Sequence, residues 1–248
     1  MDDIQRLFVD RLAAIGISLD NPDVQLRQFE TYYQWLVDWN EKMNLTGITE
    51  RDAVYEKHFY DSLTLSQAAD LPRASTLADI GSGAGFPSLP VKIVFPHLRV
   101  TIVDSLAKRI RFLREVSEAL GLRDVTCLHG RAEDSGRDPA HRDRYDIVTA
   151  RAVARQAALN ELCLPFVRTG GLFIAMKGSD VDAELEESRY SARKLNAAIR
   201  DTLALTLPGE GSARHLIVFV KQGSTPQPYP RKPGIPLKQP LVAGSIRI

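Results

Sequence analysis

The chain has little cysteine and no long apolar run. Its 248 residues include only two cysteines, Cys127 and Cys163, each inside an apolar segment and neither in a Cys-x-x-Cys pair. This pattern is typical of buried, reduced thiols. No stretch of about 18 apolar residues occurs, so we expect no membrane span. The first residues, Met1 to Ile4, are acidic where a signal peptide would be basic, so we expect a cytoplasmic protein.

Acidic residues are missing from two segments. They are absent after Glu210, where six bases follow: Arg214, Lys221, Arg231, Lys232, Lys238 and Arg247. They are also absent from the stretch after Ser105 that holds Lys108, Arg109, Arg111 and Arg114. Local basic patches on a chain of net charge +1 fit a polyanionic partner. They equally fit solvated faces whose balancing acids lie elsewhere in the sequence but nearby in space.

The order of the predicted elements divides the chain into three parts. Residues 1–70 carry apolar residues at helical spacing, with a helix start at Asn21-Pro22, and predict a helical extension packed on the core. Residues 71–222 alternate apolar runs with helical patterns, which predicts an α/β core with a mainly parallel sheet. Strands are predicted at 77–80, 99–104, 125–128, 145–150, 171–176 and 216–220. The clearest helix is expected from Ser105, as its N-cap, to Gly121. Residues 223–248 form a proline-rich basic tail, expected to be extended or irregular.

A glycine-rich turn follows the first predicted strand. Gly81, Gly83 and Gly85 follow Asp79, and Asp104 ends the next strand. Glycines let the backbone turn tightly and approach a ligand, and an acid at the second strand end can hydrogen-bond a ribose. The third glycine comes one residue earlier than in GxGxxG, and Asp79 would repel a pyrophosphate. The turn therefore favours S-adenosylmethionine (AdoMet) over NAD, with a purely structural turn as the third interpretation.

Several short motifs occur in an order typical of one family. They are Asn44-Leu45-Thr46, His58 with Asp61-Ser62, Asp79 to Pro87, Asp104-Ser105 with Lys108-Arg109, Gly130 to Glu133, and Arg151-Ala152. On these motifs the chain resembles the RsmG (GidB) family of small-subunit rRNA guanine-N7 methyltransferases. The resemblance implies a Rossmann-like class I AdoMet-dependent methyltransferase fold, with a mainly parallel seven-stranded sheet and helices on both faces.

The resemblance also implies a substrate. The activity would be AdoMet-dependent methylation of N7 of guanine 527, in the 530 loop of 16S rRNA, with S-adenosylhomocysteine as the product. The RNA would be met within the small ribosomal subunit or an assembly intermediate, and we expect a monomer without a metal. Guanine N7 has a free lone pair, so we expect direct in-line transfer without a general base, with alignment supplying the catalysis.

Site residues follow from the same resemblance. Gly81, Gly83 and Phe86 would form the floor of the AdoMet site, Asp104 with Ser105 and Leu106 would hold the ribose, and Ala132 and Glu133 would meet the adenine. The full cofactor-binding set is Gly81, Ser82, Gly83, Gly85, Phe86, Asp104, Ser105, Leu106, Ala132, Glu133 and Arg151, and the catalytic set is Arg151 and Arg131.

For Arg151, for His58 with Asp61, and for the tail, the sequence leaves two interpretations open. A cation beside a sulfonium would be repelled, so Arg151 should address an anion, the methionine carboxylate or an RNA phosphate, unless it forms a surface ion pair. His58 and Asp61, which share a helix face, could be a base with its orienting group, although a buried hydrogen-bonded pair is favoured. Tyr229 and the basic residues of the tail could clamp single-stranded RNA, or the tail could wrap along its own domain.

Three other functions fit parts of the sequence. A methyltransferase acting on a protein or a small molecule would explain the glycine turn but not the basic tail. An NAD-linked oxidoreductase would be distinguished from an AdoMet-dependent methyltransferase by titrating the protein with NAD and with AdoMet. A non-enzymatic RNA-binding assembly factor would bind rRNA without transferring a methyl group.

Overall fold

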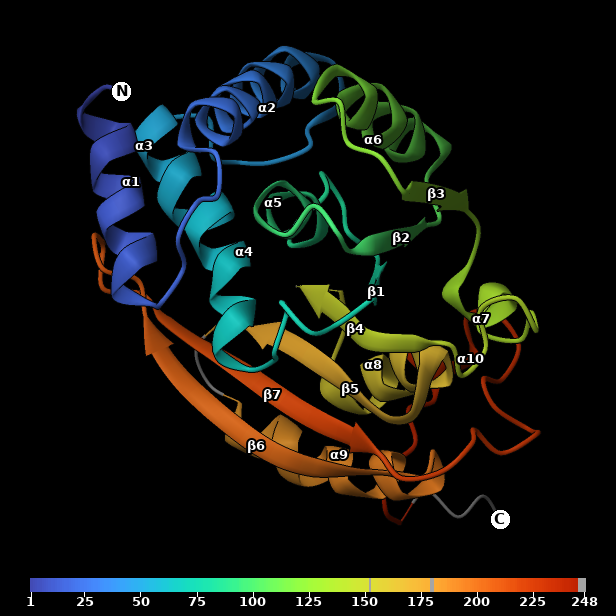
Figure 1. The fold of residues 1–248 in the computed structure, drawn as a ribbon. Helices are drawn as coiled ribbons and strands as arrows, with labels where there is room; N and C mark the ends of the chain where they lie inside the picture. The colour runs from blue at the N-terminus through green and yellow to red at the C-terminus, as the bar shows by residue number, and fades with distance from the viewer. Residues whose placement is uncertain (152, 179–180, 245–248) are drawn as a thin grey trace.

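A seven-stranded sheet forms the centre of the computed structural model, which describes residues 1–151, 153–178 and 181–244. The strands are β1 (Thr76–Ile80), β2 (Arg99–Asp104), β3 (Val125–His129), β4 (Tyr145–Arg151), β5 (Val167–Lys177), β6 (Ala197–Thr206) and β7 (Ala213–Lys221). Their order across the sheet is β3-β2-β1-β4-β5-β7-β6 (Figure 1). Strands β1 to β5 run parallel, and β7 is antiparallel to β5 and β6. The predicted mainly parallel, Rossmann-like sheet is confirmed.

Strand β6 is the one strand that the apolar runs do not predict. Only Ala197 at its start is buried, and the polar pair Arg200-Asp201 interrupts it. Its pairing with β7 shifts register between Ile199 and Asp201. Since β6 lies at the sheet edge and pairs with β7 alone, it needs no continuous apolar run, which is the signal that the other strands carry.

Helices fill most of the first seventy residues, as the apolar spacing predicts. They are α1 (Asp3–Ala14), α2 (Pro22–Met43), α3 (Arg51–Val54), the π-helical turn η1 (Tyr55–Tyr60), α4 (Asp61–Leu63) and the 3₁₀ turn η2 (Thr64–Gln67). Helix α2 begins at the predicted place: the Asn21 side chain accepts from the N–H of Val24 at 3.3 Å, and Pro22 takes the first helical position. The π-helical turn is not foreseen by the sequence, and such turns are frequent at functional sites.

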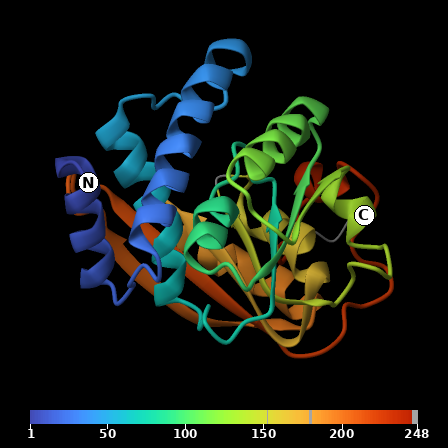
Figure 2. The same ribbon diagram turned by 45° about the horizontal axis from the view of Figure 1, so that its top comes forward.

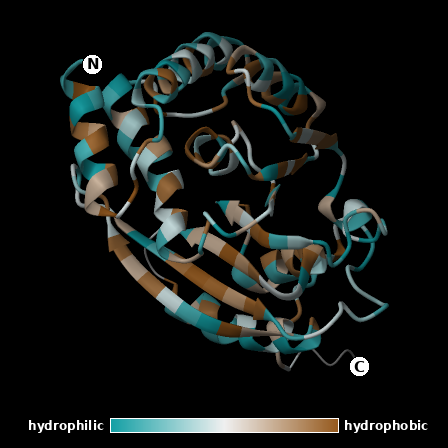
Figure 3. Cartoon of the chain, viewed as in Figure 1, coloured by the Kyte–Doolittle hydropathy of each residue, from teal (hydrophilic) through white to brown (hydrophobic). Residues whose placement is uncertain are grey.

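Two layers of helices enclose the sheet (Figures 1 and 2). The helices before β1 pack together with α5 (Ser88–Val94) and α6 (Ala107–Ala119) on one face, in a core that includes Leu77 and Ile102. The opposite face is covered by α8 (Gln156–Cys163), η3 (Leu164–Phe166) and α9 (Asp182–Lys194), with Ala78 and Val103 in its core. Successive residues of β1 and β2 thus point to opposite faces. Figure 3 shows the hydrophobic strands between helices of mixed hydropathy.

The start of α6 differs from the prediction at Ser105. The N-cap residue is Leu106, and Oδ1 of Asp104 accepts a hydrogen bond from the N–H of Leu106 at 2.9 Å. This bond holds the N–H of the N-cap residue itself, so the first N–H groups of α6 have no side-chain cap among the described residues, and Ser105 stays exposed. At the other end, Gly121 follows the cap residue Leu120 with φ +65°, the left-handed conformation expected there.

The segment after β7 is mostly irregular, as expected, and contains one short helix, α10 (Ile235–Lys238). Residues 245–248, with Arg247, lie outside the described residues, as does Ala152 of the Arg151-Ala152 motif. Cys127 and Cys163 are both buried, as predicted. Among the described helices, none combines the length and the apolar character needed to cross a membrane.

Candidate functional site

The three glycines of the turn between β1 and α5 serve different purposes. All have positive φ, +75° at Gly81, +61° at Gly83 and +98° at Gly85. A Cβ on Gly85 would lie 2.6 Å from the hydroxyl of Tyr32, and one on Gly81 would lie 2.9 Å from Val153. A Cβ on Gly83 would meet no atom of the described residues within 4 Å. Packing and φ together require glycine at the first and third positions, whereas the middle glycine leaves its side of the turn open to a ligand.

The carboxylate of Asp104 ties this turn to the end of β2. Oδ2 accepts from the N–H of Gly83 at 3.3 Å, and Oδ1 accepts from the N–H of Leu106 at 2.9 Å. Nη1 of Arg109 lies 3.6 Å from Oδ2. An ionised carboxylate offers about four acceptor positions, so Asp104 can still accept hydrogen bonds from ligand hydroxyls.

A cavity of about 280 Å³ opens beside Asp104, at the carboxyl ends of the parallel strands. Six residues expected in the site line it: Gly81, Asp104, Ser105, Arg131, Ala132 and Glu133. The other lining residues are Ile80, Val103, Arg109, Gly130, Val153, Leu162 and Leu237. Arg131 to Glu133 come from the turn after β3 and the start of α7 (Ala132–Ser135). The ends of three neighbouring strands thus meet in one cavity, at the sheet edge where such folds bind ligands.

The remaining expected residues lie next to this cavity or apart from it. Ser82, Gly83 and Gly85 shape the glycine turn, and Leu106 directly follows the lining residue Ser105. Phe86 and Arg151 lie in contact with each other in a second cluster, described below. The structure therefore divides the site residues expected from the sequence into two groups.

Two buried polar atoms near the turn lack hydrogen-bond partners among the described residues. They are Oγ of Ser82 and Oδ1 of Asp79. Burial raises the pKa of Asp79 to about 7, although Ser88 opposes the shift by donating its N–H to Oδ2 at 3.2 Å. Unsatisfied buried polar atoms are costly and uncommon, so their presence here favours a ligand-binding role for the turn.

Three large apolar side chains are exposed around the same cavity. Leu106 is 50% exposed, Val153 36% and Leu237 50%. Val153 and Leu237 line the cavity, and Leu106 borders it. Apolar side chains gathered at one opening are typical of a binding site for a partly apolar ligand.

The tail supplies one wall of this cavity, which sequence reasoning did not predict. Leu237 of α10 lines it, and the N–H of Gly234 donates a 2.8 Å hydrogen bond to Oε1 of Glu133. Arg231 forms an ion pair with Glu161 of α8 at 2.6 Å. Of the two interpretations of the tail, the structure shows the second, a segment that lies along its own domain. No spacing or motif in residues 231–238 signals this contact.

Arg151 and Phe86 belong to a second cluster around η1. Nη1 of Arg151 donates to Oδ2 of Asp61 at 3.0 Å, and Nε of Arg214 donates to Oδ1 of Asp61 at 3.2 Å. The guanidinium carbon of Arg151 lies 4.9 Å from the centre of the Phe86 ring. Arg151 thus contacts an anion, as predicted, but this anion is the carboxylate of Asp61 within the chain, which Arg151 shares with Arg214.

His58 lies between these charged groups. Its Nε2 is 2.8 Å from Oγ1 of Thr46, and its ring stacks on Phe86 with centroids 4.6 Å apart. Burial, and then the positive charge of Arg151, lower the pKa of His58 to about 3. The neutral imidazole is buried and hydrogen-bonded, but among the described residues no hydrogen bond joins it to Asp61, which binds Arg151 and Arg214 instead. The favoured interpretation of a hydrogen-bonded His58–Asp61 pair is therefore wrong. Within the described residues, no three His, Cys, Asp or Glu side chains gather as metal ligands.

Acids distant in the sequence balance several of the late bases. Arg214 pairs with Asp61, Arg231 with Glu161, and the fully buried Lys221 lies 2.8 Å from Asp143. For these three bases the second interpretation of the charge pattern holds, because their partners lie nearby in space. Two of the four bases after Ser105 also lie near acids: Nη1 of Arg109 is 3.6 Å from Oδ2 of Asp104, and Arg111 pairs with Glu115 on the exposed side of α6. Lys108 is exposed.

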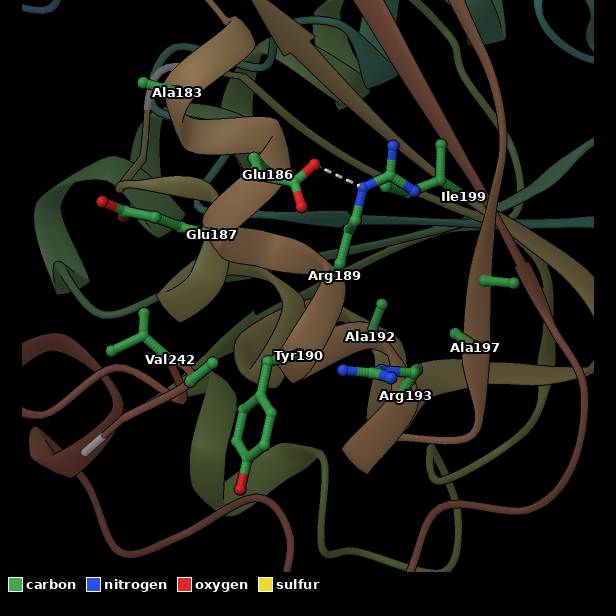
Figure 4. Close-up of a pocket in the computed structure, with 12 residues that line it drawn as sticks. Ala183, Glu186, Glu187, Arg189, Tyr190, Ala192, Arg193, Ala197, Ile199 and Val242 are labelled. Atoms are coloured by element: carbon green, nitrogen blue, oxygen red, sulfur yellow. Dashed lines mark hydrogen bonds and ion pairs between the residues drawn. The ribbon is translucent and has the colours of Figure 1, made fainter. Parts of the chain in front are cut away.

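A larger cavity, of about 780 Å³, lies elsewhere, between α9, the edge strand β6 and the tail (Figure 4). Figure 4 shows the ion pair between Glu186 and Arg189, with Tyr190 and Val242 at another part of the opening. None of the described motif residues lines this cavity. Cavity volume alone therefore does not identify the functional site. We choose the smaller cavity because the expected site residues line it.

Residues 25–216 match the model of the GidB family, described as rRNA small subunit methyltransferase G. The chain belongs to this family. A "Ribosomal RNA small subunit methyltransferase G" from Bacillus licheniformis is 54% identical over 234 residues, which cover 94% of this chain and 97% of that protein. The protein of the same name from Halalkalibacterium halodurans is 53% identical over 234 residues, covering 94% and 98%. The GidB resemblance inferred from the motifs is confirmed.

Two solved structures share the fold of this GidB-family chain. The mitomycin 7-O-methyltransferase MmcR aligns with a TM-score of 0.55 at 16% identity, over 76% of this chain and 60% of that one. TrmN from Thermus thermophilus aligns with a TM-score of 0.52 at 19% identity, over 67% and 53%. At these identities the likeness concerns the fold alone.

Proposed function

We propose that this GidB-family chain uses AdoMet to methylate N7 of guanine 527, in the 530 loop of 16S rRNA, and releases S-adenosylhomocysteine. The observation that carries the proposal is the cavity at the strand ends, where Gly81, Asp104 and Glu133 meet. It lies in a chain whose relatives are named for methyl transfer to small-subunit ribosomal RNA.

The residues around the cavity suit AdoMet. When bound there, AdoMet would supply an electrophilic methyl group carried on a sulfonium. Asp104 would accept hydrogen bonds from the ribose hydroxyls, and Ala132 and Glu133 would face the adenine. The partnerless Oγ of Ser82 and the open side of Gly83 leave polar contacts available for the rest of the ligand.

We propose that the transfer is direct and in line, without a general base. Guanine N7 is unprotonated and carries a lone pair, so no proton has to be removed from it. His58 is not available as a base, since Nε2 contacts Thr46, and Nδ1 lies 3.1 Å from the carbonyl oxygen of Lys57 and 3.4 Å from Arg151. Holding the reacting groups in line can remove roughly 7–11 kcal/mol from a barrier in favourable cases.

The two arginines expected to be catalytic would act differently. Arg131 is exposed at the rim of the cavity and would meet an anion such as an RNA phosphate. Arg151 shares the single carboxylate of Asp61 with Arg214 and lies over the Phe86 ring. We therefore propose Arg151 as a positioning residue that holds Phe86 beside the glycine turn.

We also propose how the parts of the chain work together. Residues 71–222 would form the methyltransferase core, with the helical extension 1–70 packed on it and the tail 223–248 completing the cofactor side. The protein would act as a monomer without a metal. It would act in the cytoplasm, because its substrate would be 16S rRNA in the small subunit or in an assembly intermediate.

Mass spectrometry of 16S rRNA from cells lacking this protein tests the proposal. We expect one 7-methylguanosine, at position 527, to disappear and to return when the wild-type chain is supplied. Asp104→Asn should fail to restore it, because the amide replaces one acceptor oxygen with a donor. Asp134→Asn is the matched control: Asp134 is exposed on α7 and does not line the cavity. An unchanged methylation pattern in the deletion strain would refute the proposal.

A further inference from the structure

The tail is fixed to the core by buried contacts rather than lying loosely on it. The carboxylate of Glu161 on α8 is fully buried and accepts from both Nε and Nη2 of Arg231, at 2.9 and 2.6 Å. Oε1 of Glu161 also accepts from the main-chain N–H of Arg231 at 2.7 Å. A bidentate pair with an added main-chain bond fixes both the position and the direction of the chain at this residue.

A second anchor holds the preceding segment. Arg142 donates to the carbonyl oxygens of Tyr229, Thr225 and Pro226, at 2.8, 2.9 and 3.2 Å. Nη2 of Arg137 donates to the carbonyl oxygen of Pro228 at 2.9 Å. The chain therefore reaches Arg231 along a defined path, and its position beyond Arg231 is set by the core.

Beyond these anchors the tail meets the cavity. The N–H of Gly234 donates to Oε1 of Glu133, a residue 101 positions earlier that is only 3% exposed. Three residues later, Leu237 lines the cavity and is 50% exposed. A leucine held by its backbone at a cavity, with its apolar surface uncovered, is placed to contact a ligand.

The match to the family model ends at residue 216, before this segment begins. The charge of Arg231 is neutralised by Glu161, so this residue is not available to bind RNA phosphate. The Arg231–Glu161 ion pair and the Gly234–Glu133 hydrogen bond connect residues 231–238 to the core beside the cavity, and the bases Lys232 and Lys238 of this segment are exposed.

We propose that residues 231–238 form a wall of the AdoMet pocket, in which Leu237 packs against the adenine and Gly234 orients the Glu133 carboxylate. The proposal rests on the proposed function, because it assigns the cavity to AdoMet. Leu237 would be a residue that determines affinity and selectivity for the purine end of the cofactor, with Arg231 as the positioning residue that places it.

Isothermal titration of the full-length chain with AdoMet, and separately with adenosine, tests this wall. Truncation at Leu237→Ala should weaken AdoMet roughly tenfold, the usual effect of losing one well-packed apolar contact. The affinity of Leu237→Ala for adenosine should fall by a similar factor, since Leu237 would contact the purine end of the cofactor. Leu237→Met, which keeps an apolar side chain of similar volume, should bind within about twofold of the wild type.

Leu7→Ala is the matched control, because Leu7 on α1 is 49% exposed and does not line this cavity. It should bind AdoMet as the wild type does. If the wild type binds AdoMet and Leu237→Ala binds it equally well, the wall proposal is wrong while the proposed function stands. If the wild type does not bind AdoMet, the proposed function fails, and the wall proposal fails with it.

Discussion

Arg151 and Asp61, ninety residues apart in the sequence, form an ion pair in which Nη1 of the arginine lies 3.0 Å from Oδ2 of the aspartate. The carboxylate of Asp61 is nearly buried and also binds Arg214 through its other oxygen. One carboxylate thus pairs with two guanidinium groups, which leaves these three side chains with a net positive charge, and it joins the helical segment before β1 to the end of β4 and the start of β7. Breaking such a pair leaves uncompensated charge in a poorly solvated place.

We expect Asp61→Asn to lower the free energy of unfolding by about 2–3 kcal/mol, somewhat below the usual cost for a fully buried pair because both arginines keep some contact with solvent. Urea unfolding at neutral pH measures this change. Glu187→Gln serves as the control, because Glu187 pairs with Arg155 on the surface and should change stability by less than about 1 kcal/mol. Equal unfolding midpoints for Asp61→Asn and the wild type would contradict the prediction.

The lowered pKa of His58 predicts a loss of stability in acid. Burial and the neighbouring Arg151 hold the folded-state pKa near 3, against 6.5 as the ordinary value. The stabilising effect of the neutral ring is complete above pH 6.5 and is lost as the pH falls below it, because the unfolded chain then takes up a proton that the folded chain does not. His58→Asn removes this site, so its unfolding free energy should fall less steeply between pH 7 and pH 5.

The comparison needs urea unfolding of both proteins at several pH values, since other groups titrate in the same range. One proton of difference corresponds to about 1.4 kcal/mol per pH unit. The exposed His129 gives the control, and His129→Asn should follow the pH dependence of the wild type. Parallel curves for His58→Asn and the wild type would show that the ring titrates normally in the folded chain.

Arg231→Ala should destabilise the protein by about 3–5 kcal/mol, because it leaves the fully buried Glu161 without its partner. The double variant Arg231→Ala with Glu161→Leu should recover much of this loss, since an apolar side chain avoids the buried charge. Thermal unfolding of the two variants and the wild type gives the measurement. A double variant no more stable than the single one would mean that the loss comes from tail packing rather than from the carboxylate.

The cavity residues could be predicted from the sequence because parallel topology fixes where strand ends meet. Asp104 ends β2, Glu133 follows β3 and Gly81 follows β1, so alternating strands and helices alone place them at one edge. The sequence also places Arg151 at the end of β4. It could not identify Asp61 as the partner of Arg151, since that depends on how the helical segment packs on the sheet.

Other features escaped prediction because their signals are weak or non-local. Strand β6 lacks an apolar run, and the N-cap residue of α6 is Leu106 rather than the more obvious Ser105. The π-helical turn at Tyr55 to Tyr60 has no sequence pattern that distinguishes it from an α-helix. Leu237 resembles any other leucine of a proline-rich tail until the path of the chain is known.

The hydrogen bond from Gly234 to Glu133 also has a consequence for the order in which the protein is made. Glu133 and Glu161 leave the ribosome long before Gly234 and Arg231, which lie 101 and 70 residues later. During synthesis the sheet can form while both carboxylates still lack these partners. The cavity acquires its last wall only when residues 231–237 have emerged, so a nascent chain holds an incomplete cavity until this segment has left the ribosome.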